Sequence, residues 1–150
     1  MYQRILVPID ESATSELALK EAALLAKERE ATPRLAHVID NTFTYTAWLT
    51  QREVVERQSE LRRLGEGILS RGAAGARALG ANAETTLLTI VNPGDRVCDS
   101  MELEAVRWPA GLVVIGTRGR RGFRRLLLGG GAEGLIRITT KPVLLVRGVE

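Results

Sequence analysis

Short apolar or β-branched runs recur along the chain and are separated by longer segments with a helical period. The runs read RILVPID, RLAHVID, ETTLLTIV, LVVIG and PVLLV, at residues 4–10, 34–40, 84–91, 112–116 and 142–146. A strand that is apolar at successive positions is buried on both faces, as the strands of a parallel sheet are. The pattern therefore predicts five strands of a mostly parallel sheet.

The segments between these runs carry the signals of helices. Ser12 can cap a helix in which Ala18, Ala22 and Leu25 share one face. We expect this helix to end near Glu30, before Pro33. Three more helices are expected: a long polar one after NTFTYTAWL, with Val54, Leu61 and Ile68 at heptad spacing and Gly80 as its stop; one over 95–108; and one before the last strand.

Five strands that alternate with four helices predict a single α/β domain spanning residues 1–150. A chain of this length buries enough surface for one core. The crossovers between parallel strands are right-handed, which places helices on both faces of the sheet. Ligands of such sheets bind beyond the carboxyl ends of the strands, where the strand order reverses. Asp10, the end of HVID and the loop from Gly116 should meet there.

Charge and glycine are concentrated in one segment, GTRGRRGFRRLLLGGGAEG, at residues 116–134. The chain has a net charge of +3, and the five arginines of residues 118–125 account for all of this excess. Glycines allow backbone amides to point at an anion, and the N-terminus of the following helix adds positive charge. The segment therefore suggests a phosphate site. A solvated basic loop whose glycines only satisfy turn geometry is an equal alternative.

Several other classes of protein are disfavoured. No Gly-Lys-Ser or Gly-Lys-Thr occurs, so a P-loop is absent, and Gly129, Gly131 and Gly134 do not directly follow a strand as a dinucleotide fingerprint would. Cys98 is the single cysteine, which leaves no intrachain disulfide. The apolar run near Met1 is too short for a signal peptide and none approaches ~20 apolar residues. We expect a cytoplasmic protein with no membrane partner.

Gly116, Gly119 and Gly129 spell GxxG-x9-G ahead of a helix and a final PVLLVR strand. With ILVPID at the start and HVID in the second strand, the whole chain resembles the universal stress protein family. The resemblance implies a flavodoxin-like, Rossmann-like strand order of 3-2-1-4-5 and ATP bound where that order reverses. It places Pro8 and Asp10 beside the nucleoside and Val38 against adenine. The full set of implied nucleotide-binding residues is Pro8, Ile9, Asp10, Val38, Ile115, Gly116, Arg118, Gly119, Gly129, Gly130 and Gly131.

The position after the third glycine departs from the family pattern. ATP-binding members usually have Ser or Thr there, and this chain has Gly130. Loss of a hydroxyl-to-phosphate hydrogen bond weakens affinity by roughly tenfold to a hundredfold, while the backbone amides remain. We therefore expect weakened ATP binding. Mg²⁺ would be held through the phosphates, with Asp10 as the one candidate side-chain contact.

We do not expect an enzyme. No histidine, glutamate or lysine is evidently placed to orient water at the γ-phosphate, and arginine stays protonated at neutral pH, so ATP hydrolysis should be at most very slow. The favoured function is a nucleotide-binding regulatory or stress-response protein with an unknown protein partner. Two alternatives stay open: an interaction module that binds no nucleotide, and a nucleic-acid binder that uses the arginines of 118–125, which is less favoured.

Individual residues also have structural interpretations. Asp10 is as well suited to the turn that starts the first helix as to a ligand. His37, the single histidine, is expected to be a satisfied core or sheet-edge imidazole, and Cys98 a packed thiol. Phe43, Tyr45 and Trp48 could cover the adenine, although packing beneath a crossover connection is the favoured role.

The last strand predicts an assembly. In the 3-2-1-4-5 order it lies at an edge of the sheet, and residues 143–146 are all apolar. An exposed apolar edge is a hazard that proteins ordinarily cover. The resemblance implies that a second copy covers it, so that a homodimer forms through residues 142–147. A monomer whose short edge is shielded by Pro142 and Arg147 is the alternative.

Overall fold

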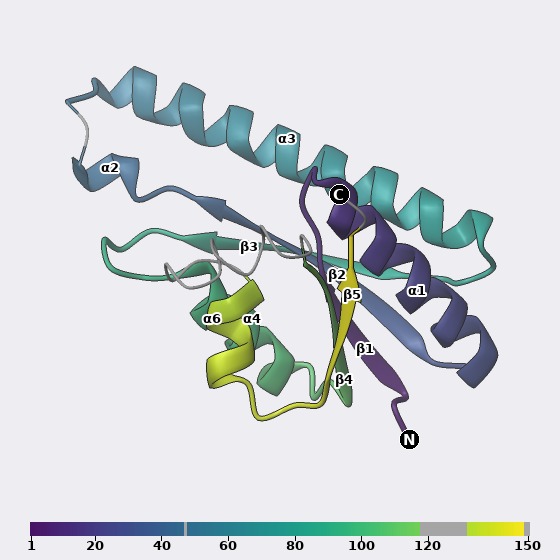
Figure 1. Ribbon diagram of the computed structural model, residues 1–150. Coiled ribbons are helices and arrows are strands. Elements are labelled where there is room, and N and C mark those ends of the chain that lie inside the picture. Colours follow the sequence, from purple (N-terminus) through teal and green to yellow (C-terminus); the bar gives the residue numbers. More distant parts are fainter. Residues whose placement is uncertain (47, 118–131, 149–150) are drawn as a thin grey trace.

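The computed structural model describes residues 1–46, 48–117 and 132–148 and consists of one parallel sheet between two layers of helices (Figure 1). The elements in chain order are β1 (Arg4–Pro8), α1 (Ala13–Arg29), β2 (Thr32–Asp40), α2 (Phe43–Thr46), α3 (Gln51–Ala78), β3 (Glu84–Ile90), α4 (Val97–Arg107), β4 (Leu112–Thr117), α6 (Ala132–Ile138) and β5 (Val143–Arg147). The five strands are ordered β3-β2-β1-β4-β5, and every neighbouring pair is parallel. The predicted fold class and strand order are confirmed.

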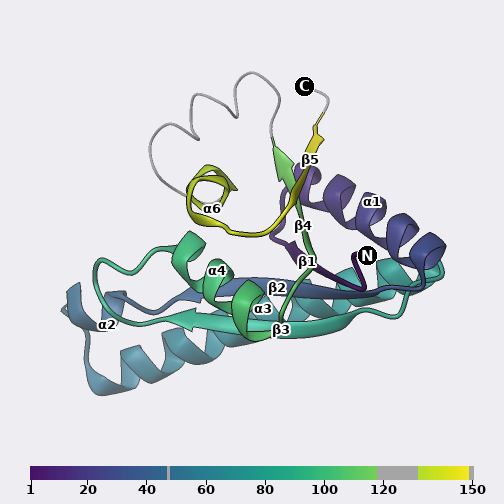
Figure 2. The ribbon, with the colours of Figure 1, turned by 90° about the horizontal axis from the view of Figure 1, so that it is seen from below.

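The helices divide between the two faces of the sheet (Figures 1 and 2). Ile5 and Val7 of β1 pack with buried residues of α1 and α3, whereas Leu6 between them packs with α4 and α6. All three side chains are fully buried. This burial on both faces explains why the strand is apolar at successive positions.

The helix ends follow the capping chemistry in the sequence. The Ser12 hydroxyl accepts a hydrogen bond from the Ser15 backbone N–H at 3.2 Å, so Ser12 caps α1 as predicted. Thr50 and Glu53 form a reciprocal capping box at the start of α3. Gly80, two residues past the end of α3, has a φ of +91°, which confirms it as the residue that stops this helix.

Three local features differ from the prediction. β2 begins at Thr32 and so includes Pro33, which is tolerated because β3 begins only opposite Arg34 and leaves Pro33 beyond its end. A short helix, α2, lies within NTFTYTAWL, where no helix was predicted. Trp48 is fully exposed, so the packing role predicted for it is wrong, whereas the Phe43 ring lies 5.0 Å from the Arg57 guanidinium. The side chain of Tyr45 lies outside the described part.

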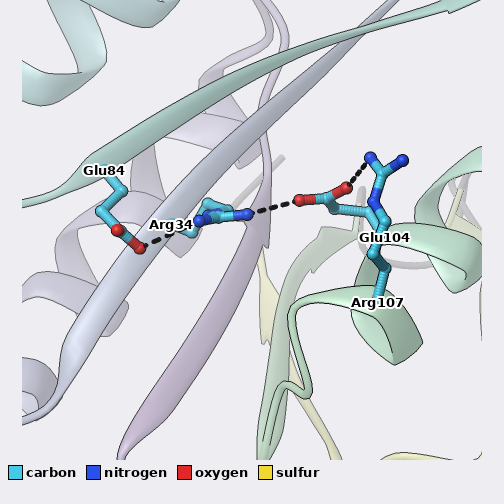
Figure 3. Close-up of polar contacts among 4 residues, drawn as sticks. All are labelled: Arg34, Glu84, Glu104 and Arg107. Carbon is cyan, nitrogen blue, oxygen red and sulfur yellow. Dashed lines mark hydrogen bonds and ion pairs between the residues drawn. The ribbon is translucent and has the colours of Figure 1, made fainter.

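A network of charged side chains closes the amino end of the sheet (Figure 3). Glu104 of α4 is only 1% exposed and accepts hydrogen bonds from Arg34 of β2, at 2.7 Å, and from Arg107. Arg34 also bonds Glu84 of β3 at 3.3 Å, and its guanidinium lies 4.5 Å from the centre of the Trp108 ring. The network thus ties two strands to α4 at one end of the sheet.

Candidate functional site

A cavity of about 340 Å³ lies at the carboxyl ends of β1 and β4, the strands between which the chain order reverses. Its lining includes every predicted site residue that the structure describes, namely Pro8, Ile9, Asp10, Val38, Ile115 and Gly116. These residues come from β1, the loop after it, β2 and β4. The structure therefore brings them together in the crevice where open α/β sheets bind ligands.

The loop after β1 forms one wall of this cavity through a compact turn. Asp10 Oδ1 accepts a hydrogen bond from the Ser12 backbone N–H at 2.7 Å, and the Asp10 N–H donates to Ser15 Oγ at 2.9 Å. Asp10 thus holds the turn that starts α1, while Ser12 is the cap itself. Because Asp10 also lines the cavity, the structural role and the ligand role predicted for it are compatible.

Gly116 has a packing role that the sequence did not reveal. A Cβ atom there would lie 2.2 Å from the carbonyl oxygen of Thr14, in the first turn of α1. The backbone of β4 can approach α1 this closely only where it carries no side chain. Helix packing alone therefore requires glycine at position 116, whatever the residue does toward a ligand.

Apolar side chains form much of the remaining lining. Val38 and Ile115 are joined by Met101 of α4 and Leu135 of α6, and all four belong to the packing layer between the sheet and these two helices. The hydroxyl residues Ser12, Thr14 and Ser15 come from the start of α1 on the other side of the sheet. A molecule in this cavity would meet an apolar surface and a polar one.

His37 borders the cavity but is already engaged in the fold. Its Nδ1 lies 2.8 Å from the carbonyl oxygen of Ile9, and since a carbonyl only accepts, Nδ1 carries the proton and donates it. Its ring also lies against α3, where a Cβ atom at Gly65 would be 3.2 Å from His37 Cδ2. The predicted satisfied imidazole is confirmed.

The rest of the predicted loop site lies outside the described residues. This applies to Arg118, Gly119, Gly129, Gly130 and Gly131, and to the arginines of residues 118–125. The residues on either side of this segment that border the cavity are Gly116 and Ala132. Both Gly116 of β4 and Ala132 of α6 thus lie at the cavity.

Several lining residues were not predicted from the sequence. Met101 and Leu135 have the helical spacing of ordinary core residues, and Val97 lies at the start of α4, so nothing in the pattern distinguishes them. Thr14 and Ser15 could have been found, because hydroxyl residues next to a helix cap at the carboxyl end of β1 necessarily lie beside the crevice.

Two further expectations concern Cys98 and the sheet edge. Cys98 is 1% exposed and packs α4 against α6, where a Cβ atom at Gly134 would be 2.7 Å from its sulfur, so the packed thiol is confirmed. β5 lies at the edge of the sheet as predicted and pairs with β4. Its Leu144 and Leu145 are 39% and 40% exposed.

Within residues 1–46, 48–117 and 132–148, no three potential metal-ligating side chains gather in one place. None of the helices described there has both the length and the apolar character needed to cross a bilayer.

Solved structures of similar proteins share this fold. A universal stress protein family member from Burkholderia pseudomallei is 26% identical with a TM-score of 0.71, and the match covers 97% of this chain and 96% of that one. A universal stress protein solved in complex with cAMP is 23% identical with a TM-score of 0.72, covering 97% of both chains. An Arabidopsis thaliana family protein with AMP bound is 16% identical with a TM-score of 0.65, covering 97% of this chain and 91% of that one.

Sequence comparisons give the family. The chain is 30% identical to universal stress protein YxiE of Bacillus subtilis over 153 residues, which cover 98% of this chain and 100% of that protein. It is 32% identical to universal stress protein MJ0531 of Methanocaldococcus jannaschii over 148 residues, covering 98% of this chain and 83% of that protein. Residues 1–147 match the family as a whole. The chain belongs to the universal stress protein family.

Proposed function

We propose that this protein is a regulatory universal stress protein that binds ATP at the carboxyl ends of β1 and β4. The observation that carries the proposal is the cavity lined together by Pro8, Asp10, Val38, Ile115 and Gly116. Its volume of about 340 Å³ falls within the range of small-molecule sites. Family members of the same fold solved with cAMP and with AMP support an adenine nucleotide as the ligand.

The two kinds of cavity wall suit the two parts of a nucleotide. Adenine would lie against Val38 and Ile115, where its flat apolar faces replace water. Asp10 would accept a hydrogen bond from a ribose hydroxyl with the carboxylate that also holds the turn. The phosphates would extend toward Gly119 and Gly129–Gly131. The backbone amides of these glycines and a Mg²⁺ ion would both bind the phosphates.

A regulatory role suits the cavity better than catalysis. Among the described residues that line it, two have titratable side chains, Asp10 and His37. Asp10 bonds the Ser12 N–H, and His37 donates its Nδ1 proton to Ile9. Both side chains thus have a role in holding the loop after β1, and we expect at most very slow hydrolysis. ATP occupancy would instead alter which protein partner binds.

Calorimetric titration with Mg-ATP tests the proposal. The wild type should bind weakly, because Gly130 replaces the usual hydroxyl residue. Gly130→Ser should tighten binding by roughly tenfold to a hundredfold, since it restores a charge-assisted hydrogen bond to phosphate. Absence of binding heat with both proteins would refute ATP binding. Displacement of ATP by bulk nucleic acid would favour the basic segment of residues 118–125 as a nucleic-acid site.

We also propose that two copies pair through residues 142–147. The support is the edge position of β5 together with the exposure of Leu144 and Leu145. Leu145→Lys should shift light scattering from dimer to monomer, because it places charge on the edge. Val106→Lys, on an exposed position of α4, is the matched control and should leave the dimer intact. A monomeric wild type at high micromolar concentration would contradict the pairing.

A further inference from the structure

Thr117 is the last residue of β4, and its hydroxyl is buried without a partner. The residue is 3% exposed, and no described residue forms a hydrogen bond with its Oγ1. Glu102 and Glu133 also have a buried oxygen without a partner, but the second oxygen of each carboxylate is bonded. Thr117 has only one polar side-chain atom. A buried hydroxyl without a hydrogen bond is unfavourable, so this position calls for an explanation.

The side chain of Thr117 faces the layer of α4 and α6. Successive residues of a strand point to opposite faces of the sheet. Gly116 faces α1, because a Cβ atom there would meet Thr14, and Ile115 packs with residues of α4 and α6. Thr117 pairs with Arg147 of β5, so the strand is regular up to this residue. Thr117 therefore lies on the same face as Ile115, on the side of β4 where Figure 2 shows α6.

This position adjoins the candidate nucleotide site. Ile115 and Gly116 line the cavity at the carboxyl ends of β1 and β4, and Thr117 follows them in the direction in which the strands end. Two residues span about 6–7 Å along a strand, so the Thr117 side chain lies one such step beyond that of Ile115. In the proposed complex the base lies against Ile115, and the phosphates extend past the ends of the strands, toward Thr117.

The hydroxyl groups that line the cavity are already bonded within the fold. Ser12 Oγ accepts a hydrogen bond from the Ser15 backbone N–H and lies 3.1 Å from Thr14 Oγ1. Ser15 Oγ accepts a hydrogen bond from the Asp10 N–H at 2.9 Å. Thr117 differs from these three residues, because its hydroxyl has no bond within the described part of the chain.

Packing does not explain a hydroxyl at this position. Valine has a shape similar to that of threonine and is equally suited to a strand, and it occupies positions 113 and 114 of β4. A valine at position 117 would fill the same space without burying a polar group. A ligand that accepts the hydroxyl proton accounts for threonine here.

We propose, on the basis of the nucleotide site put forward above, that Thr117 Oγ1 donates a hydrogen bond to a phosphate oxygen of the bound nucleotide. The phosphate would supply the missing acceptor, and a hydrogen bond to a charged oxygen is stronger than one between neutral groups. Gly130 lacks the hydroxyl that is usual at its position. The Thr117 hydroxyl would therefore provide a large part of the affinity for the phosphates.

Calorimetric titration of Thr117→Val with Mg-ATP tests this role. The variant should bind ATP roughly tenfold to a hundredfold more weakly than the wild type, because a charge-assisted hydrogen bond is lost. Its melting temperature without nucleotide should stay the same or rise, since an unpaired buried hydroxyl is removed. Thr117→Ser keeps the hydroxyl and should bind ATP much as the wild type does. The same exchanges in the Gly130→Ser background keep weakened binding measurable.

Thr85→Val is the matched control. It makes the same exchange at an exposed position of β3 that does not line the cavity, and it should leave ATP affinity unchanged. The ³¹P NMR resonances of bound ATP should differ between the wild type and Thr117→Val, because a hydrogen bond to a phosphate oxygen changes the electron density at phosphorus.

Three results would overturn the role of Thr117 while leaving the nucleotide site in place. The first is equal ATP affinity of the wild type and Thr117→Val. The second is a lowered melting temperature of Thr117→Val with unchanged affinity, which would show that the hydroxyl serves the fold. The third is weakened binding with ³¹P resonances identical to those of the wild type. Absence of ATP binding by both the wild type and Gly130→Ser would instead refute the site itself, and this role with it.

Discussion

The two ends of the same sheet are built in opposite ways. At the amino end, Arg34, Glu84, Glu104 and Arg107 neutralise one another across β2, β3 and α4 (Figure 3). At the carboxyl end, polar groups such as Asp10 hold the backbone of a turn and leave a cavity beside it. The charged side chains at the amino end pair with one another within the fold, whereas the carboxyl end leaves a cavity that a ligand can occupy. Changes at the two ends should therefore affect different properties.

The largest effect is expected at the amino end. Glu104→Ala would remove a buried side chain and the two charge-assisted hydrogen bonds that it accepts from Arg34 and Arg107, and each bond of this kind contributes about 1.5–3 kcal/mol to the unfolding free energy. Denaturant unfolding measures this loss. ATP affinity should stay the same wherever the variant is folded. Glu56→Gln, which breaks an exposed ion pair with Arg52, should leave the unfolding free energy unchanged within error. A loss of stability as large as that of Glu104→Ala would contradict the structural role of the amino-end network.

At the carboxyl end, Gly116→Ala should destabilise the protein by about 1–3 kcal/mol, because the new methyl group would meet the Thr14 carbonyl. ATP affinity should fall as well, since α1 must move away from β4 beside the cavity. Gly75→Ala is the matched control: its Cβ has room, and alanine should stabilise α3 by about 1 kcal/mol. Thermal unfolding without nucleotide separates the two. A Gly116→Ala protein as stable as wild type would refute the packing role.

The smallest effect should come from the start of α3, away from both ends. The hydrogen bond from the Thr50 backbone N–H, followed by that with its hydroxyl, lowers the pKa of Glu53 from the ordinary 4.5. A carboxyl group whose pKa is lower in the folded protein than in the unfolded chain stabilises the fold at pH values above the unfolded pKa. This stabilisation is lost as the pH falls from about 4.5 through the pKa of the folded state. Glu53→Gln should flatten that part of the stability profile slightly. An unchanged profile would contradict the charged capping box.

Much of the fold was predictable because its signals are local. Successive apolar residues marked the buried strands, and Ser12 and Gly80 marked helix ends. The amino-end network was not predictable, because Arg34 and Glu104 are 70 residues apart and only the fold brings them together. Trp48 was mispredicted because aromatic character alone does not distinguish a packed side chain from an exposed one.

The candidate site divides in the same way. Residues at the carboxyl ends of strands, such as Asp10 and Val38, could be placed from topology, because parallel strands end at one edge of the sheet. Met101 and Leu135 could not, since a helix residue that lines a cavity has the same spacing as one in the core. The close approach of α1 to Gly116 depends on three-dimensional packing and has no sequence signal.

Methyl NMR with Mg-ATP tests the central claim most directly, because it reports which cavity the nucleotide enters. Saturating shifts are expected at Val38, Ile115 and Leu135, which line the cavity at the carboxyl ends of the strands. Ile68 and Leu79, which line a separate cavity between α1 and α3, should stay unchanged. No shift at millimolar Mg-ATP, or shifts confined to Ile68 and Leu79, would contradict the nucleotide site.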